Sequence, residues 1–411
     1  MAHVVRSLVS FRSDQARLVA YVSVAHGLVH TIELTYAALL SRIEAEFGGG
    51  FLALGAIANV FAFTFGASAL PAGFLVDRFG SRRVLVAAFI AAAALSVLVA
   101  LSPNPWWLAV SLGLLGLAIG LYHPAGISLI AQGAEQRSLA FGYHGVSGNV
   151  GIALAPVLAV GVAVAFGWRA AYVVTASLAL VVVATLRFLS LPAGAGEAPV
   201  REPAVARRDP SPAPLTALLV VYAAFVLNGF VYRGSLTFIP THLEDRLSVG
   251  DAWVGALTTA ALLAGAFGQL AGGALAERHA LERLVPLQAL ALAPGLLLIG
   301  ALSGFVLVPV VGAFVFAYFA GQPIFTSLIA DYSPPDALGR SYGFTFFAAF
   351  GLGSGAATFA GFFADRWGTD AVFFALAGVA ALTFALTLRI WRYGEERART
   401  GAARRQAIAV D

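Results

Sequence analysis

Very few ionisable residues interrupt the long apolar runs of this sequence, and those few are the candidates for chemistry. His26, His30 and Glu33 follow one another at i, i+4 and i+7, a spacing that places the three side chains on one face of a helix. Arg233 stands inside a later apolar run. A charge inside hydrocarbon costs about 2.5–3.5 kcal/mol on insertion scales, so each of these residues is a functional hypothesis.

Glu33 and Arg233 lie at similar depths in their runs, and we expect them to face one cavity and to pair across it, directly or through substrate. We predict that Glu33 is the proton-coupling carboxylate and that His26 and His30 relay the proton, because imidazole titrates near neutral pH. A guanidinium keeps its charge and fits a carboxylate, phosphate or phosphonate with two hydrogen bonds. Arg233 is therefore predicted to bind an anionic substrate.

Other interpretations of the same residues stay open. Glu33 and Arg233 are also consistent with a structural ion pair that locks two halves of the protein together. His26 and His30, with Glu33 as a third ligand, are also compatible with a transition-metal site. His144, near the end of its run, is equally well explained as a hydrogen-bonded structural imidazole. We favour proton coupling, without a bound metal or other cofactor.

Further polar and aromatic side chains within the runs are predicted to contribute to the same cavity. Each offers a hydrogen bond or a ring to an amphiphilic ligand. The predicted substrate-binding residues besides Arg233 are Asn228, Tyr232, Tyr36, Asn59, His123, Tyr122, Asn149 and Gln322.

The elements that must position these residues are membrane-spanning helices. Of the 411 residues, 60% are hydrophobic and 11% charged, with a mean hydropathy of +0.86, whereas a soluble domain has roughly 45–50% and about 25%. A span needs about 20 apolar residues in a helix. Twelve such runs are present: 17–40, 51–76, 84–101, 106–131, 139–166, 169–190, 215–240, 252–276, 284–302, 305–330, 341–364 and 370–393.

The runs fall into two sets of six, which predicts an all-α membrane protein with two bundles. A segment rich in Pro, Ala and charge, 191–214, reads as a cytoplasmic linker between bundles 1–190 and 215–393, and 394–411 is predicted to be a cytoplasmic tail. Nothing in the sequence resembles a phosphate loop or implies nucleic acid, and there is no cysteine. We therefore expect a monomeric transporter driven by a gradient rather than an enzyme, although a sensor or a lipid flippase with this architecture stays open.

The arginines predict the orientation in the membrane. All 25 basic residues are Arg, and if the N-terminus is cytoplasmic, twenty of them fall on the cytoplasmic side and four, Arg42, Arg169, Arg246 and Arg366, on the other. Positive charge is retained in the cytoplasm. Both termini are thus predicted to be cytoplasmic, in a bacterial-type inner membrane.

The second six runs repeat the first at an offset of about 200 residues. The segment 70–78 aligns with 270–278, which pairs Asp77 with Glu277, and Pro124 aligns with Pro323. His26-Gly27 aligns with Asn228-Gly229. Several matches in chain order indicate a duplicated six-helix unit, and two similar bundles suggest alternating access around a site at the membrane midplane.

A loop between the second and third runs carries a family resemblance. Its sequence is Gly73-Phe-Leu-Val-Asp77-Arg78-Phe-Gly80-Ser-Arg82-Arg83. It resembles the signature loop of the major facilitator superfamily, with a departure at Ser81 that shifts the basic pair by one. We predict that this loop is a gate that holds the bundles together in the outward-open state. The predicted gating residues are Gly73, Asp77, Arg78, Gly80, Arg82 and Arg83, with Glu277 and Arg278 in the second copy.

A narrower resemblance concerns the fourth and fifth runs. Leu-Tyr-His123-Pro124-Ala-Gly and Gly148-Asn149-Val-Gly151 are similar to stretches of bacterial exporters of the fosmidomycin-resistance type. That resemblance implies a proton-driven antiporter. We therefore expect proton-coupled export of a small organic, anionic compound, with proton symport (uptake) or transition-metal transport through His26, His30 and Glu33 as alternatives.

Overall fold

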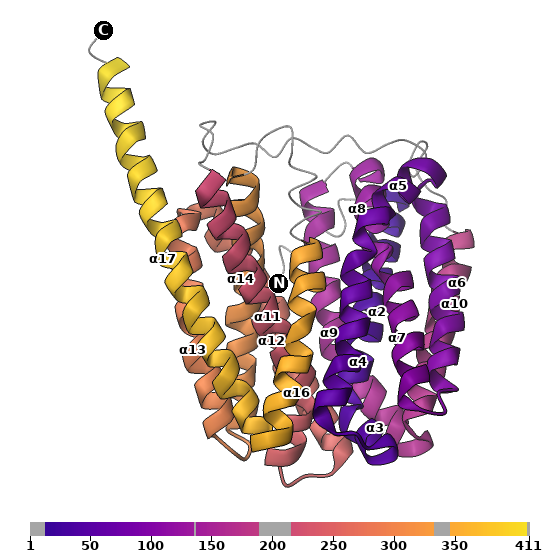
Figure 1. Cartoon of the computed structure of the whole chain (residues 1–411). Coiled ribbons are helices and arrows are strands. Elements are labelled where there is room, and N and C mark those ends of the chain that lie inside the picture. The colour runs from indigo at the N-terminus through magenta and orange to yellow at the C-terminus, as the bar shows by residue number, and fades with distance from the viewer. Residues whose placement is uncertain (1–12, 135–136, 189–214, 333–345, 409–411) are drawn as a thin grey trace.

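The computed structural model describes residues 13–134, 137–188, 215–332 and 346–408, which form helices and short connections (Figure 1). The first half contains α2 (Ser13–Ala38), α3 (Leu40–Phe47), α4 (Gly50–Ala67), α5 (Ala69–Phe79), α6 (Ser81–Ala100), α7 (Pro105–Gly120), α8 (Tyr122–Gly133), α9 (Arg137–Phe166) and α10 (Trp168–Phe188). The second half contains α11 (Leu215–Arg246), α12 (Asp251–Arg278), α13 (Leu281–Ala301), α14 (Leu307–Tyr332), η2 (Phe347–Gly351), η3 (Leu352–Ser354), α16 (Gly355–Trp367) and α17 (Thr369–Ile408).

Twelve stretches among the described residues are long and apolar enough to cross a membrane, as the sequence predicted. Each of the twelve overlaps one predicted run; the second consists of α4 and α5, and the fourth of α7 and α8. Their buried fraction lies between 39% and 78%, so much of each span faces outward, where a membrane protein meets lipid. The all-α membrane fold is confirmed.

The break between α7 and α8 has a clear cause in the sequence. Proline lacks an N–H group, and its ring collides with the carbonyl four residues earlier, so a helix is interrupted there. Pro124 stands four residues after Gly120, where α7 ends. The interruption starts a new helix at Tyr122 and places His123 in its first turn.

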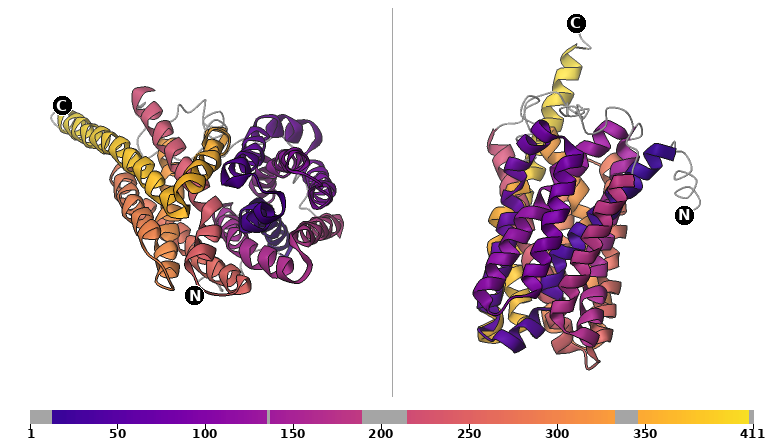
Figure 2. Two further views of the ribbon diagram at one scale, coloured as in Figure 1. Left: turned by 60° about the horizontal axis from the view of Figure 1, so that its bottom comes forward. Right: turned by 90° about the vertical axis from the view of Figure 1, so that its right-hand side faces the viewer.

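The helices form two bundles that lie side by side, α2–α10 and α11–α17 (Figures 1 and 2). Between the bundles, α9 packs on α12, α4 on α16 and η2, and α2 on α11. Glycines make the α4–α16 contact possible: a Cβ atom on Gly55 would lie 2.3 Å from the carbonyl oxygen of Ala357, and one on Gly361 would lie 2.2 Å from that of Phe51. The two backbones touch at points that no larger residue would fit.

The bundles have two different ends. At one, which we call the terminal end, α2 and α11 begin and α10 and α17 end; at the other, the opposite end, lie α3 and the starts of α4 and α12 (Figure 1). The last span continues as a single helix to Ile408 and projects beyond the other helices at the terminal end (Figures 1 and 2). The predicted linker, 191–214, lies outside the described residues.

Candidate functional site

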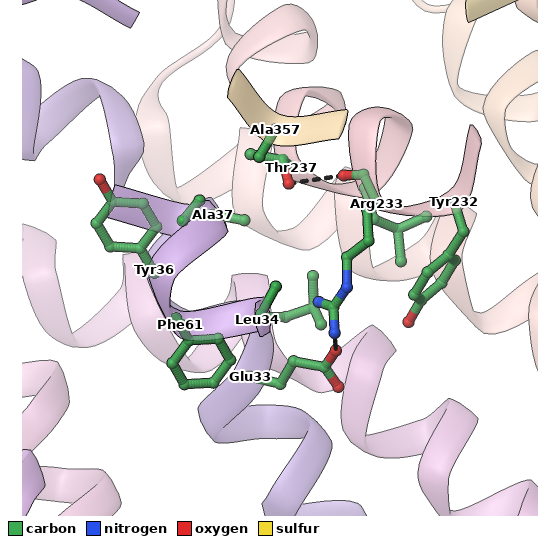
Figure 3. A pocket seen from close by; sticks show the side chains of 12 residues that line it. Glu33, Leu34, Tyr36, Ala37, Phe61, Tyr232, Arg233, Thr237 and Ala357 are labelled. Atoms are coloured by element: carbon green, nitrogen blue, oxygen red, sulfur yellow. Dashed lines mark hydrogen bonds and ion pairs between the residues drawn. The ribbon is translucent and has the colours of Figure 1, made fainter. Parts of the chain in front are cut away.

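A buried ion pair joins the two bundles at their centre. Nη2 of Arg233 on α11 lies 2.5 Å from Oε1 of Glu33 on α2 (Figure 3). Glu33 is 4% exposed and Arg233 8% exposed. The structure thus brings together the two residues that we expected to face each other. Because each comes from a different bundle, relative movement of the bundles acts directly on this contact.

The pair borders a small cavity between the bundles. Its volume is about 30 Å³, room for one or two water molecules and not for an organic substrate. It is lined by Glu33, Leu34, Tyr36, Ala37, Ala58, Phe61, Ala62, Tyr232, Arg233, Leu236, Thr237 and Ala357 (Figure 3). An organic substrate at this point therefore needs more room than the cavity offers in this conformation.

The guanidinium of Arg233 is poorly satisfied for a buried cation. Its Nη2 is close to Glu33, but the alignment is not that of a hydrogen bond, and its Nε has no hydrogen-bond partner among the described residues. Aromatic rings supply part of the missing solvation: the guanidinium carbon lies 5.0 Å from the ring centre of Phe350, 5.7 Å from Tyr232 and 6.0 Å from Phe65. Buried N–H groups without acceptors are ready to receive a ligand with oxygen atoms.

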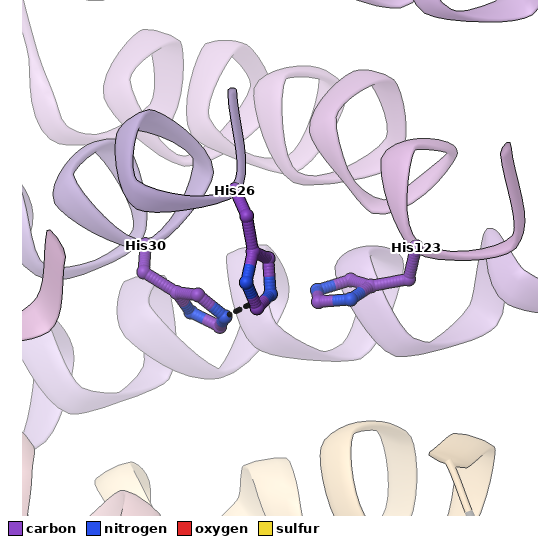
Figure 4. A group of neighbouring side chains, drawn as sticks. All are labelled: His26, His30 and His123. Atoms are coloured by element: carbon purple, nitrogen blue, oxygen red, sulfur yellow. Dashed lines mark hydrogen bonds between the residues drawn. The ribbon is translucent and has the colours of Figure 1, made fainter. Parts of the chain in front are cut away.

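A chain of histidines continues from the other oxygen of Glu33 into the N-terminal bundle. Nδ1 of His30 lies 2.5 Å from Oε2 of Glu33, and Nε2 of His30 lies 3.1 Å from Nε2 of His26 (Figure 4). Nδ1 of His26 lies 2.6 Å from the backbone carbonyl oxygen of His144. An unbroken series of polar contacts therefore links Arg233, through one carboxylate and two imidazoles, to the backbone of α9.

Rings and glycines hold these imidazoles in place. The ring of His144 stacks on that of His26 with centroids 3.7 Å apart, and the Tyr122 hydroxyl donates to the carbonyl oxygen of Val22 at 2.5 Å. A Cβ atom on Gly148 would lie 2.6 Å from His26 Cε1. The Gly148-Asn149-Val-Gly151 stretch is thus explained in part: its first glycine makes room for the imidazole pair, and Gly151 makes room for the backbone of Gly27.

The predicted transition-metal set is altered by the structure. The donor atoms that lie within 4.8 Å of one another belong to His26, His30 and His123, not to Glu33. Both Glu33 oxygens are committed, one to Arg233 and one to His30. Nε2 of His123 is buried without a hydrogen-bond partner in the described part of the chain. A transition-metal site would therefore use His123 in place of Glu33, as an alternative to the polar contacts of His26 and His30.

Two of the other predicted substrate residues line the cavity, Tyr36 and Tyr232. The Tyr36 hydroxyl donates to the carbonyl oxygen of Leu54, and the Tyr232 ring stacks on Tyr318 with centroids 5.0 Å apart. Gln322 reaches the same aromatic group, since its Nε2 donates to the Tyr318 hydroxyl at 2.8 Å. The C-terminal bundle therefore adds a second polar and aromatic group next to Arg233.

The remaining predicted substrate residues lie outside the lining of the cavity. Both side-chain polar atoms of Asn228 and Oδ1 of Asn59 are buried without partners within the described ranges. Asn149 connects the bundles, because its Nδ2 donates to Oε1 of Gln269 on α12 at 3.1 Å. Tyr122 is held by backbone and His144 and supports the histidines rather than the cavity.

Comparison with known proteins identifies the family. The model of the Major Facilitator Superfamily matches residues 22–358 and 254–409. The chain belongs to the major facilitator superfamily. It is accordingly a multi-pass membrane transporter and not an enzyme, as the sequence predicted.

Curated relatives match over part of their length. The multidrug resistance protein MdtG of Dickeya zeae is 33% identical over 151 residues, which are 35% of this chain and 37% of the relative. The galacturonate transporter of Dickeya chrysanthemi is 34% identical over 119 residues, 27% of this chain and 32% of the relative. The chain spans about a third of the length of these two relatives.

Solved structures show the same fold over nearly the whole chain. A bacterial homologue of the human lysosomal transporter Spinster, inward-facing and occupied, has a TM-score of 0.79 at 13% identity, covering 93% of this chain and 98% of that chain. The human organic anion transporter MFSD10 has a TM-score of 0.63 at 19% identity, covering 92% and 100%. At these identities the likeness concerns the fold alone.

The loop that resembles the superfamily signature lies at the terminal end. Gly80 separates α5 from α6 with φ of +80°, a backbone conformation that glycine adopts without steric cost. Arg82 donates to the carbonyl oxygen of Leu186 at 2.9 Å, within its own bundle, and Arg78 lies over the ring of Phe79. The departure residue, Ser81, hydrogen-bonds Ser128 on α8.

The predicted gate makes no close approach at its first glycine. A Cβ atom on Gly73 would have no neighbour within 4 Å among the described residues, and the same holds for Gly273. Arg83 and Arg278 are exposed. The side chains of Asp77 and Glu277 lie outside the described residues, so their part in the gate stays a prediction.

Contacts between the bundles at the opposite end were not predicted from the sequence. Asp365 near the end of α16 accepts hydrogen bonds from the backbone N–H groups of Phe51 and Leu52, at 2.6 and 2.8 Å. These N–H groups belong to the first turn of α4, so a carboxylate of one bundle caps a helix of the other. Arg42 forms an ion pair with Asp251.

A third contact lies beside these two. The Ser41 hydroxyl donates to Glu244 at 2.7 Å. We call the three contacts, made by Ser41, Arg42, Glu244, Asp251 and Asp365, the opposite-end latch. These contacts are difficult to predict from the sequence, because acidic residues near helix ends are common on any protein surface.

Proposed function

We propose that this protein is a proton-coupled secondary transporter of a small organic anion, with Arg233 as the anion-binding group and Glu33 as the proton-coupling group. The observation that carries the proposal is the Glu33–Arg233 pair itself. It is buried, it joins the two bundles, and among the described residues it leaves the guanidinium Nε–H without an acceptor. Alternating access then consists of rocking of the bundles around this pair.

An anion is the ligand that this guanidinium fits best. Arginine stays protonated at any physiological pH and presents a planar fork of donors, which a carboxylate or phosphonate matches with two hydrogen bonds. Glu33 occupies only one side of that fork. Hydrogen bonds to charged groups contribute roughly 1.5–3 kcal/mol each, so a ligand that uses both arms competes well with a single misaligned contact.

Proton coupling follows from the charge of the site. When the site is empty, Arg233 and Glu33 neutralise each other. When an anion replaces Glu33 on the guanidinium, the released carboxylate is a buried anion in a poor solvent, and taking up a proton removes that cost. Both the empty site and the site with anion and proton are neutral, whereas either ligand alone leaves a net charge. Anion and proton should therefore bind together.

Binding of both ligands together favours symport, which an inward proton gradient drives toward uptake. The relative named as a galacturonate transporter supports an anionic substrate, since galacturonate is a carboxylate. Export by antiport is the second candidate. It is favoured by the similarity to the multidrug resistance protein MdtG and by the resemblance to exporters in the fourth and fifth spans.

The site of action proposed here is a bacterial-type inner membrane, with the terminal end in the cytoplasm and the protein working as a monomer. The distribution of arginines supports this orientation. A reporter that fluoresces only in the cytoplasm, fused after Asp411, would be bright, and a dark fusion with normal expression would reverse the assignment.

Transport by the purified protein in proteoliposomes tests the proposal. A panel of radiolabelled anions that includes galacturonate, an alkylphosphonate and a benzoate would be offered with an inward pH gradient, an outward one and none. We expect accumulation of at least one anion that depends on the gradient. Arg233→Lys keeps the charge and loses the fork, so its affinity should fall by about ten- to a hundredfold.

Two outcomes would contradict the proposal. Normal anion affinity in a well-folded Arg233→Lys protein would remove Arg233 from the binding site and leave a structural ion pair. Transport of neutral or cationic compounds, without transport of any anion in the panel, would show that the substrate is not an anion. Proton flux against substrate flux in the same vesicles separates symport from antiport.

A further inference from the structure

We propose that Glu33, His30 and His26 form one chain that binds a single added proton. The proton is counted from a reference state with an ionised Glu33 and two neutral imidazoles, and once it is bound every contact in the chain is satisfied. The proton is held jointly by the three side chains and not by Glu33 alone. This inference deepens the proposed function. It rests on that function only in that an anion, by binding to Arg233, moves the proton. The argument starts from the two fixed ends of the chain.

One end fixes the form of His26. Its Nδ1 lies 2.6 Å from the backbone carbonyl oxygen of His144, and a carbonyl oxygen can only accept. Nδ1 of His26 therefore carries a hydrogen. In a neutral imidazole the other nitrogen, Nε2, then has a lone pair and no hydrogen.

The other end fixes the form of His30 when Glu33 is ionised. Nδ1 of His30 lies 2.5 Å from Oε2 of Glu33, whose Oε1 is paired with Arg233. An ionised carboxylate only accepts, so Nδ1 of His30 also carries a hydrogen. If both imidazoles were neutral, two Nε2 lone pairs would face each other at 3.1 Å, which is repulsive.

One added proton resolves the conflict in either of two ways. The proton can lie between the two Nε2 atoms, so that His30 and His26 share one positive charge beside the ionised Glu33. Alternatively, Glu33 is protonated and donates to Nδ1 of His30, while Nε2–H of His30 donates to Nε2 of His26. Every contact is satisfied in both arrangements. A second added proton would again leave two like groups facing each other.

The two arrangements differ by movement of hydrogens along bonds that are already formed. Passing from the first to the second breaks the N–H bond at Nδ1 of His30 and forms the O–H bond at Oε2 of Glu33, over 2.5 Å, while the shared hydrogen settles on Nε2 of His30. The number of protons is unchanged. When an anion takes Arg233 away from Glu33, the carboxylate can be neutralised by its own chain without contact with water.

The groups around the chain set the sign of its pH dependence. Those that face it from other helices are Tyr122 and His123 on α8, His144 on α9, and Tyr232 and Arg233 on α11. Arg233 is the permanent charge among them and opposes the added proton. An anion on Arg233 cancels that charge, so anion binding strengthens proton binding, and by linkage a proton strengthens anion binding.

Proton uptake on anion binding tests this inference directly. The purified full chain in weakly buffered detergent would be mixed with the anion identified in vesicles, and proton uptake would be followed with a pH dye. We expect uptake to approach one proton per protein in the pH range where the free chain is unloaded and the anion-bound chain is loaded, and to vanish at low pH, where the chain is already loaded. Within the pH range where protons are taken up, anion affinity should fall about tenfold for each unit by which the pH rises, which is the slope for one linked proton.

Substitution separates the chain from a lone carboxylate. In His26→Gln the opposed lone pair is gone, so the range of uptake should move to lower pH although anion binding persists. His242→Gln is the matched control. His242 is also buried in a span, but its two nitrogens are bonded to Thr369 and to the carbonyl oxygen of Ile299, within the C-terminal bundle. This control should match the wild type.

The outcomes distinguish the two proposals. If no anion binds to the wild type, the proposed function fails, while nitrogen-15 spectra of the histidines still test the chain, in which His26 must carry its hydrogen on Nδ1. If the anion binds and His26→Gln has the profile of the wild type, Glu33 acts alone and the chain is refuted. Stoichiometric binding of Zn²⁺ or Ni²⁺ alone, lost in His123→Gln, would also refute it in favour of a metal site.

Discussion

Replacing Asp365 by alanine should weaken the opposite-end latch, because it removes one of its three contacts. Asp365 accepts two backbone N–H groups at 2.6 and 2.8 Å from the first turn of α4, and hydrogen bonds to a charged group contribute roughly 1.5–3 kcal/mol each. Asp365 is exposed, so water compensates much of this loss. We take about 1–2 kcal/mol as the net effect, which shifts the equilibrium between joined and separated ends about five- to thirtyfold.

Spin labels can measure this shift without background, because the sequence contains no cysteine. Cysteines introduced at Trp106 and Phe305, exposed residues near the opposite end of the two bundles, would carry the labels. Electron–electron distance measurements on Asp365→Ala should show a longer distance gaining population over the wild type.

Glu46 supplies the matched control. It also lies at the opposite end and accepts two hydrogen bonds, from Arg169 and from Trp168, both at 2.6 Å, but all three residues belong to the N-terminal bundle. The hydrogen bond from Arg169 lowers the pKa of Glu46, so the control carboxylate is charged at neutral pH. Glu46→Ala should leave the distances unchanged. If Asp365→Ala gives the distances of Glu46→Ala, the cap does not hold the bundles together and our reasoning is refuted.

The remaining predictions concern coupling and gating. Glu33→Gln should abolish accumulation driven by a pH gradient and leave counterflow exchange largely intact. Normal accumulation in this variant would exclude Glu33 as the proton-coupling residue. Asp77→Asn should slow transport and favour the inward-open state with little change in affinity in detergent, and a large loss of affinity with unchanged populations would place it in the binding site. Gly148→Ala should cost about 1–3 kcal/mol of stability by overpacking and weaken proton coupling. Gly161→Ala is the control and should do neither, because a Cβ atom there meets nothing within 4 Å in the described part of the chain. Equal thermal unfolding and equal coupling of the two variants would show that the imidazoles tolerate the methyl group.

The fold could be predicted from the sequence because the bilayer imposes it. Backbone groups inside hydrocarbon must be bonded within each span, so apolar length alone indicates a helix, and the twelve runs were found with small errors at their ends. Two spans continue well past their predicted ends: the last helix continues to Ile408, beyond the predicted residue 393, and the seventh span continues through Pro240 to Arg246. A proline removes one hydrogen bond from a helix without ending it when packing holds both sides, and Pro240 is buried.

The residues of the site could be predicted only where burial of a charge in hydrocarbon is energetically costly. Glu33 and Arg233 are charges that hydrocarbon penalises, so their presence pointed to a cavity, and the structure pairs them. His144 gave no such signal, because its position near the end of a run is typical of a structural imidazole. Its carbonyl becomes the anchor of His26 only through the close packing of α2 on α9 at Gly27 and Gly151, a three-dimensional fact that spacing along one helix cannot reveal.

The proposed proton chain and the opposite-end latch both bear on the relative movement of the two bundles. The hydrogen-bonding groups of the chain come from α2 and α9 of one bundle, except Arg233, which comes from the other. The state described here has the opposite end joined by the latch and the guanidinium in contact with Glu33. Separating the bundles at that end strains the contact at the centre, and neutralising Glu33 removes the attraction that resists separation. Protonation of Glu33 through its own chain should therefore lower the barrier to opening the latch when an anion is present, which is the condition for transport without a leak of protons.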